Sequence, residues 1–258
     1  MYVQYVSDIH LEFEPNRENF DDIIIPNEGQ KGILILAGDI CTTQYLDLLR
    51  KFLKYCKTFW DIVAYIPGNH EYYHNNIQTA NEVLRKLCLE ENVLFCSKRL
   101  ISIPHPSKNS RVKIICTSLW SNIEKQHEEE IVRNLNDYKL IEGFKPNDSN
   151  LMHQEMKSFI ANCVEGCKEE EPSCQIIVAT HHAPVLQGAS FPSHVGTPMN
   201  SAFCSDCTDI MKNVDHWIFG HTHYNPKPFT VGETMLHSNQ RGYNGNSKHY
   251  NLKASLYI

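Results

Sequence analysis

The sequence predicts an α/β domain built on a buried, parallel or mixed β-sheet. Short apolar runs with the length of strands alternate with segments whose apolar residues keep helical spacing. Five of these runs stop at clusters of Asp, His or Asn. In open sheets of this kind, ligands lie beyond the carboxyl ends of the strands. We therefore expect a functional site where these five strands end.

Length and composition restrict the class of protein. At 258 residues, the chain can bury a sizeable core, in one large domain or two small ones. Its net charge of −6 disfavours nucleic acid or a membrane surface as the main partner. The first residues lack the basic and apolar regions of a signal peptide, and no apolar run approaches the ~18 residues of a membrane span. We therefore expect a cytoplasmic protein.

The first third of the chain alternates strands with helices. Strands are expected at residues 2–6, 33–36 and 62–66. Helices are expected around 46–56, where Thr42 or Thr43 can cap the helix, and around 77–87. The polar residues 14–31, which include Pro and Gly, are expected to form mostly loop.

The remainder continues the alternation. Further strands are expected at residues 93–95, 100–103, 112–116, 176–179 and 217–219. Helical spacing covers residues 122–163, with an interruption at 143–150, and also Phe203 to Met211. From Lys227 onward the pattern is typical of antiparallel strands, with a Gly-rich turn at 242–245.

The clearest strand end is the stretch from Tyr65 to Tyr73. Pro67 and Gly68 stop the apolar run, and Asn69, His70 and Glu71 then offer an amide oxygen, an imidazole and a carboxylate. The other strand ends supply Asp8, His10, Asp39, His181, His182, His221 and His223. Such mixed ligands suit Mn²⁺, Fe or Zn²⁺, and they are too many for one tetrahedral ion but enough for two.

Each cluster also has a simpler interpretation. Gly38-Asp39 and Gly68-Asn69 are ordinary turn or cap sequences, and His181-His182 is compatible with a hydrogen-bonded pair in the core. Their succession, each at the end of a predicted strand, favours a metal centre.

The ten cysteines do not indicate disulfides, because the chain is long and has no export signal. Cys204 and Cys207 form one C-x-x-C pair, with Cys163, Cys167 and Cys174 upstream. A zinc site and free thiols on a helix face and a loop are both open, and free thiols are the favoured interpretation.

Taken together, the motifs resemble those of the calcineurin-like metallophosphoesterase superfamily. They are Asp8-x-His10, Gly38-Asp39, Gly68-Asn69-His70-Glu71, His181-His182 and Gly220-His221-Thr222-His223. The segments 200–203, 205–206 and 239–243 are similar to a bacterial-type branch of predicted phosphohydrolases. The resemblance implies a four-layer αββα sandwich with two mixed sheets and a dinuclear metal site at the carboxyl ends of the strands. It also implies one domain over residues 1–258, with a helical insertion around 122–163.

The resemblance assigns two sets of metal ligands. Asp8, His10, Asp39 and His223 would hold the first ion. Asn69, His221 and one histidine of the His181-His182 pair would hold the second, with Asp39 bridging both. His181 is preferred because it is the first imidazole after the strand, and His182 would then support a ligand or face the substrate. Two divalent ions are expected, with Mn²⁺ preferred and Fe, Zn²⁺ or Ni²⁺ as alternatives.

The remaining residues have implied or open roles. His70 would protonate the leaving oxygen or stabilise the charge of the transition state. Glu71 would orient His70 or cap the following turn. Arg241 is a candidate phosphate ligand, with a surface Arg in a β-turn as the alternative. Asn200 and Trp120 could line the pocket, although a helix cap and a core aromatic are the favoured interpretations.

The resemblance therefore implies a metal-dependent phosphoesterase that hydrolyses a phosphodiester or phosphomonoester by in-line attack of a metal-bridging hydroxide. A small soluble phosphoester is expected as substrate, with nucleotides among the candidates. Two departures narrow the class. Thr42 replaces the tyrosine of purple acid phosphatases, and Cys41 to Gln44 replaces the Asp-Arg-Gly sequence of protein phosphatases. A catalytically weak binding scaffold and a nuclease remain as alternatives, although the sequence offers no basic face for a nuclease.

Overall fold

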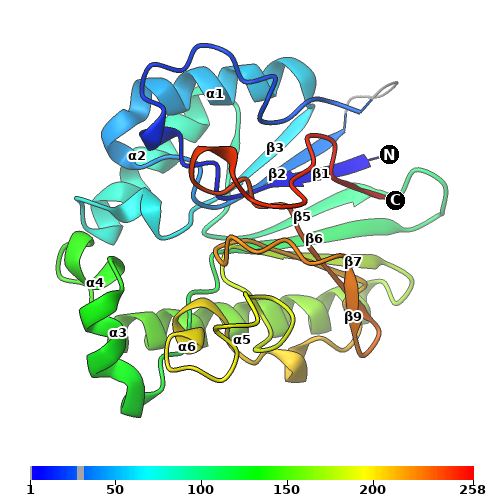
Figure 1. Cartoon of the computed structure of the whole chain (residues 1–258). Coiled ribbons are helices and arrows are strands. Elements are labelled where there is room, and N and C mark those ends of the chain that lie inside the picture. The colour runs from blue at the N-terminus through cyan, green and yellow to red at the C-terminus, as the bar shows by residue number, and fades with distance from the viewer. Residues whose placement is uncertain (1, 28–31) are drawn as a thin grey trace.

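Two mixed β-sheets pack face to face, and helices cover both outer faces (Figure 1). The computed structural model describes residues 2–27 and 32–258. Separate apolar clusters lie between the first helical layer and its sheet, between the two sheets, and between the second sheet and its helices. The four-layer αββα sandwich with two mixed sheets is thereby confirmed.

The first sheet has the strand order β11-β1-β2-β3-β4. Its strands are β1 (Tyr2–Val6), β2 (Ile33–Ala37), β3 (Ile62–Ile66), β4 (Leu94–Phe95) and β11 (Ser255–Tyr257). Strands β1 to β4 are parallel, and β11 pairs with β1 in the antiparallel sense. The central strands are almost continuously apolar because both of their faces are covered.

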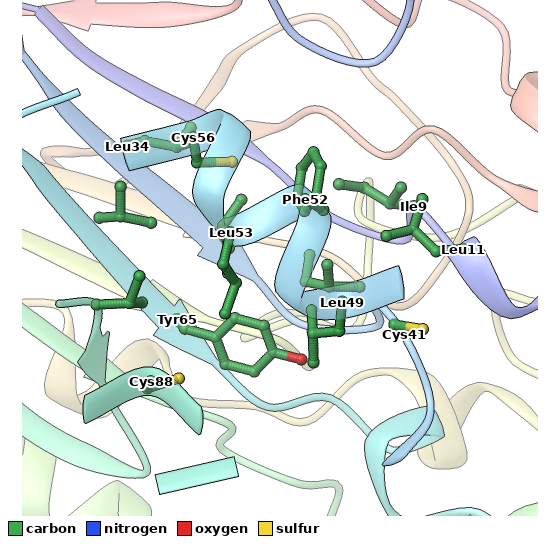
Figure 2. Close-up of a cluster of buried hydrophobic side chains, with 14 of the residues drawn as sticks. Ile9, Leu11, Leu34, Cys41, Leu49, Phe52, Leu53, Cys56, Tyr65 and Cys88 are labelled. Carbon is green, nitrogen blue, oxygen red and sulfur yellow. The ribbon is translucent and has the colours of Figure 1, made fainter. Parts of the chain in front are cut away.

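Helices α1 (Leu46–Phe59) and α2 (Ile77–Glu90) cover the outer face of this sheet. Figure 2 shows the cluster in which Leu49, Phe52 and Leu53 of α1 lie beside Leu34 and Tyr65 of the sheet. All five side chains are fully buried. Burial of each contributes about 1.5–3 kcal/mol to the free energy of unfolding, so this layer holds the ends of β1 to β3 in place.

The second sheet has the strand order β5-β6-β7-β8-β10-β9. Its strands are β5 (Lys98–Pro104), β6 (Arg111–Thr117), β7 (Gln175–Thr180), β8 (His216–Phe219), β9 (Phe229–Val231) and β10 (Thr234–Ser238). The four central strands are parallel, whereas the edge strands β5 and β9 are antiparallel. The expected antiparallel tail is right for β9 and β10, which pair with each other, and for β11, which pairs with β1, although β10 also runs parallel to β8.

The segment around 122–163 contains α3 (Glu128–Asn134), α4 (Asp137–Leu140) and most of α5 (Pro146–Glu170). Together with α6 (Asn200–Phe203), α5 lies on the outer side of the second sheet (Figure 1). The expected interruption at 143–150 is too long. Pro146 occupies the first turn of α5, where its missing N–H costs nothing, so the helix begins there.

Two further expectations about helices were wrong. The helix over Phe203 to Met211 does not form, because α6 ends at Phe203 and Cys204 instead pairs with Ala183 beyond the end of β7. Only a short 3₁₀ turn, Thr208–Ile210, follows. Neither Thr42 nor Thr43 caps α1, which a 3₁₀ turn at Thr43–Tyr45 precedes without a side-chain cap.

The expected loop at residues 14–31 holds no helix or strand in its described part, and residues 28–31 lie outside the described residues. No helix within residues 2–27 and 32–258 has both the length and the apolar character that crossing a membrane requires.

Candidate metal centre

The polar segments that follow β1, β2, β3, β7 and β8 meet at one edge of the two facing sheets. Parallel strands bring their carboxyl ends to the same edge, and the sheets are packed with these edges together. Three groups of side chains have donor atoms within 4.8 Å of one another. The first is Asp8, His10 and His223, the second is Asp39, His181 and His221, and the third, which shares His10 with the first, is His10, Glu12 and His70. All seven candidate ligands predicted from the sequence, Asn69 included, come together here.

The first group brings two segments of the chain together. Nε2 of His10 lies 2.9 Å from Nε2 of His223, and the latter lies 3.3 Å from Oδ1 of Asp8. When two imidazole nitrogens at this separation both present lone pairs, they do not attract each other. A cation between or beside them makes the arrangement favourable. The arrangement therefore fits a cation ligated by both rings and the carboxylate.

Asp39 lies between the first and second groups. Its Oδ2 is 3.9 Å from Nε2 of His10 in the first group, and its Oδ1 is 3.4 Å from Nε2 of His181 in the second. Nε2 of His181 also lies 3.0 Å from Oδ1 of Asn69. One carboxylate thus faces both donor groups, the position that a bridging ligand needs.

The hydrogen bonds fix which imidazole nitrogen is available. Nδ1 of His181 lies 2.9 Å from the carbonyl oxygen of Ala37, which can only accept, so Nδ1 carries the proton and Nε2 is free to bind a cation. Both ring nitrogens of His221 are buried and have no hydrogen-bond partner among the described residues. A buried, unpartnered imidazole is unusual in a native protein and fits a metal ligand.

The charges of the site are also suited to cations. Burial raises the pKa of Asp39, but the imidazoles of His181 and His70 outweigh it and hold that pKa well below its usual range. Burial lowers the pKa of His221 to about 3, which keeps this ring neutral. Divalent metals require ionised carboxylates and neutral imidazoles. Burial lowers the pKa of His181, but the carboxylates of Asp39 and Asp8 raise it to about 10, so a metal ion would displace the proton on its Nε2. The donor set therefore fits two divalent ions of the borderline type.

Five of the candidate ligands have left-handed backbone conformations. The φ values are 52° at Asp8, 53° at His10, 53° at Asp39, 71° at His221 and 51° at His223. Such a conformation costs a residue with a Cβ roughly 1 kcal/mol or more, and it tends to persist at functional sites. The surrounding structure thus holds these side chains in the site at an energetic cost.

Two glycines allow the ligand segments to approach closely. A Cβ at Gly38, where φ is 88°, would overlap the His181 ring, and a Cβ at Gly68 would overlap the Asp39 carboxylate. The Gly-Asp and Gly-Asn sequences are therefore required by the packing of the site and not only by turn geometry.

His70 lies at the rim of this centre. Its backbone N–H donates to Oδ1 of Asp39 over 2.9 Å, and its Nδ1 lies 2.9 Å from Oε1 of Glu12. Burial lowers the pKa of His70, but the carboxylates of Asp39 and Glu12 raise it to about 9. The ring therefore holds a proton at neutral pH, as a general acid does.

Glu71 has a structural role that the sequence did not indicate. Its carboxylate accepts hydrogen bonds from the backbone N–H groups of Gly68, Asp39 and Ile40 and from the hydroxyl of Tyr65. Among the contacts of the described residues, none joins Glu71 to the His70 ring or to the turn that follows. Glu71 instead ties the two ligand turns after β2 and β3 together.

Sequence reasoning missed three residues that support the centre. Glu12 contacts His70 and, at 3.1 Å, Nδ1 of His10. Asp137 of α4 accepts from Nδ2 of Asn69 over 2.8 Å, which turns the amide oxygen of Asn69 toward His181. Gln240 accepts the backbone N–H of His223. Glu12 follows His10 by two residues and Gln240 lies in the segment 239–243 named above, so both were open to detection, whereas nothing in the local sequence distinguishes Asp137.

A cavity of about 310 Å³ lies at the centre. Its walls include the Asp39, Asn69, His70, His221 and His223 side chains. Residues 134–136 of the helical segment also line it, together with Phe191, His194, Phe203 and Tyr243. The helical segment thus covers one side of the cavity and does not lie only at the periphery.

The predicted substrate contacts lie elsewhere. Arg241 is buried and pairs with Glu14, so its guanidinium is already occupied. Asn200 lies inside α6, where its amide bonds to Ser190 and to the carbonyl of Leu186. None of Arg241, Asn200 and His182 lines the cavity.

His182 and Trp120 pack behind the site. Nδ1 of His182 lies 3.3 Å from the carbonyl oxygen of Ser118, and its ring lies 4.1 Å from that of His221, between the centroids. Trp120 is fully buried and packs against Phe144, so it is a core aromatic. His182 therefore supports a candidate ligand by ring contact.

Cys204 and Cys207 are buried in the apolar cluster beneath the second sheet. Burial raises the pKa of each thiol to about 12, which opposes the thiolate that zinc binding needs. Within the described residues, no potential metal-binding group includes a cysteine.

Comparisons with known proteins agree with this geometry. Residues 1–225 match the family model described as calcineurin-like phosphoesterase. An uncharacterized protein of Acanthamoeba polyphaga mimivirus is 28% identical over 284 aligned positions, which cover 99% of this chain and 96% of that protein.

Two solved structures share the fold. Phosphopantetheinyl hydrolase from Mycobacterium tuberculosis superposes with a TM-score of 0.72 at 18% identity, covering 94% of this chain and 89% of that chain. A putative 5′-nucleotidase from Staphylococcus aureus gives a TM-score of 0.52 at 16% identity, over 93% of this chain and 48% of that chain.

Proposed function

The chain belongs to the calcineurin-like phosphoesterase family, and on this premise we propose that it hydrolyses a phosphodiester or phosphomonoester of a small soluble molecule. Family membership makes it a metal-dependent phosphoesterase in general terms. The observation that carries the finer proposal is the position of Asp39, whose two oxygens face two separate groups of donor atoms. That arrangement supports a dinuclear centre.

We assign Asp8, His10, Asp39 and His223 to one ion. Asp39, Asn69, His181 and His221 are assigned to the other. Two divalent ions would supply Lewis-acid activation of water and would offset the negative charge of the phosphate. Mn²⁺ is the preferred metal, with Fe, Zn²⁺ or Ni²⁺ as alternatives. Because Asn69 is neutral, the centre retains positive charge toward a phosphate.

His70 is the proposed general acid. Since the Glu12 carboxylate can only accept, Nδ1 of His70 donates to it, and Nε2 is left to serve the cavity. From that position the ring delivers its proton to the leaving oxygen as the bond between phosphorus and that oxygen breaks. Tyr243 lies 3.4 Å from the same Nε2 through its hydroxyl and limits the directions in which the ring can turn.

The experiment is hydrolysis of bis-p-nitrophenyl phosphate and p-nitrophenyl phosphate by protein loaded with Mn²⁺, Fe²⁺, Zn²⁺ or Ni²⁺, with the bound metal measured in parallel. We expect turnover with at least Mn²⁺ and about two ions per chain. Protein that binds metal but hydrolyses neither compound with any of these ions would support a binding scaffold of the same fold. The Asp39→Ala variant is the matched control, because it should lose both ions.

A further inference from the structure

A second, larger cavity adjoins the candidate metal centre. It has a volume of about 610 Å³, and it shares the walls formed by His223 and Phe191 with the cavity at the centre. Its remaining walls come from residues 224–227 and 246–249. A molecule with its phosphoryl group at the metal centre can therefore extend past His223 into this space.

The charged side chains in this cavity have one sign. Lys227 and Lys248 line it together with His249, and no carboxylate is among the lining residues. In the part of the chain that the structure describes, neither lysine forms an ion pair, so both charges are available to a ligand in the cavity. In a chain with a net charge of −6, two unpaired lysines beside one cavity form a local anion-attracting region.

Aromatic side chains form another part of the wall. The rings of Phe191 and Tyr224 lie 5.1 Å apart between centroids, and Phe191 is 42% exposed. Exposed aromatic faces next to cations can hold a ring system whose neighbouring group is anionic. The cavity thus combines a flat apolar contact with positive charge.

We infer that this cavity is a second substrate subsite, which binds a phosphate group carried by the organic part of the phosphoester. The inference rests on the proposed function, because it needs the scissile phosphate at the metal centre. Lysine suits such a group, since its ammonium binds phosphate as a flexible point charge. The substrate class is therefore a phosphoester with a second phosphate, and a phosphorylated nucleoside is one member.

The test uses two probes that differ by one phosphate, thymidine 5′-(p-nitrophenyl phosphate) and the same compound with a 3′-phosphate. With Mn²⁺-loaded protein we expect kcat/KM to be about tenfold higher for the 3′-phosphorylated probe, mainly through KM, which corresponds to about 1.4 kcal/mol. The double variant Lys227→Ala/Lys248→Ala should lose this preference and keep its kcat/KM for bis-p-nitrophenyl phosphate. Replacing both lysines by arginine should retain the preference.

The double variant Lys54→Ala/Lys86→Ala is the matched control. Both lysines are exposed, on α1 and α2, so their substitution removes the same charge far from the cavity. Equal rates for the two probes, or a preference that survives Lys227→Ala/Lys248→Ala, would overturn the inference. Failure of the protein to hydrolyse both bis-p-nitrophenyl phosphate and p-nitrophenyl phosphate would instead refute the proposed function.

A measurement of equilibrium binding tests the subsite separately from the proposed hydrolytic activity. Thymidine 3′,5′-bisphosphate should bind the metal-loaded protein about tenfold more tightly than thymidine 5′-monophosphate, and the lysine-to-alanine double variant should abolish the difference. This measurement needs no turnover. Equal affinities for the two nucleotides would count against the subsite even in an inactive protein.

Discussion

Oε1 of Glu12 lies 2.9 Å from Nδ1 of His70. The same oxygen lies 3.1 Å from Nδ1 of His10. Burial raises the pKa of Glu12, but its hydrogen bonds with His10 and His70 outweigh this and lower it, so the carboxylate is ionised. An ionised carboxylate only accepts, and both rings must donate from Nδ1. Glu12 therefore selects the tautomer of a candidate ligand and of the proposed acid at once.

We predict that Glu12→Gln lowers kcat for bis-p-nitrophenyl phosphate about tenfold, because a supporting residue of this kind typically contributes 10–100-fold. The amide keeps the shape of the side chain but removes the charge that holds both protons in place. Because Glu12 also orients His10, the affinity for the ion assigned to His10 should fall on the order of tenfold, as measured by titration of the metal-free variant, so kcat is compared at saturating metal. An unchanged kcat would show that Glu12 has no positioning role.

For His70→Ala we predict a loss of turnover of about 10²-fold or more, as for removal of a general acid, with both ions retained. The reason is that His70 falls in a group with His10 and Glu12, where Glu12 occupies its Nδ1, and not in either of the two groups to which the ions are assigned. Metal analysis and initial rates on the same preparation test this. If His70→Ala and Asp39→Ala lost equal amounts of metal, the assignment of His70 as an acid would be wrong.

Asn69→Ala should weaken the occupancy of one ion only. The amide oxygen of Asn69 faces His181, whereas Asp8, His10 and His223 lie in the other group. Titration of the metal-free variant with Mn²⁺ should show one site weakened on the order of tenfold or more and the other unchanged. Asp137→Asn, which disturbs the partner of Nδ2 of Asn69, should weaken the same site to a smaller degree. Simultaneous loss of both ions would contradict separate ligand sets.

His237 predicts a pH dependence of stability that is independent of the metal centre. Burial and the neighbouring His216 lower the pKa of His237 to about 4, whereas the unfolded chain has a value near 6.5. The unfolded state then binds more protons than the folded state between these values. The free energy of unfolding should therefore fall as the pH drops from about 6.5 to about 4, by on the order of 2 kcal/mol from this group.

Urea unfolding at several pH values tests this prediction. His237→Gln should flatten the acid dependence relative to the wild type, whereas His249→Gln, at an exposed position, should leave it unchanged. Parallel curves for the wild type and His237→Gln would show that burial of this imidazole does not contribute.

The part of the candidate site that follows from local sequence, namely the polar residues at the strand ends, was predictable. Apolar runs that stop at Asp39 or Asn69 identify strand ends, and parallel strands bring such ends together without any knowledge of the packing. The preference for His181 also followed from chain order, because the first residue after β7 points into the gap between the sheets, where Nδ1 reaches Ala37 of the first sheet.

What the sequence could not supply depends on contacts between distant segments. Arg241 was a candidate phosphate ligand, with a surface Arg in a β-turn as the alternative, but it is buried and Glu14, 227 residues earlier, occupies its guanidinium. Asp137 reaches Asn69 only because α4 packs over the end of β3, and its neighbours in sequence give no indication of this. Residues after Phe203 have helical spacing, yet the pairing of Cys204 with Ala183 satisfies the backbone in an extended form.

The C-terminal segment returns to the first sheet, and this affects the order in which the protein folds during synthesis. Strand β11 pairs with β1, and the backbone of Asn239, Arg241 and Gly242 bonds to that of Ser7 and Asp8. Asp8 therefore reaches its final position only after residues 239–257 have left the ribosome. We expect a nascent chain stalled before Asn239 to build both sheets in part and to bind neither ion firmly. Assembly of this centre therefore depends on the order of synthesis and waits for residues 239–257.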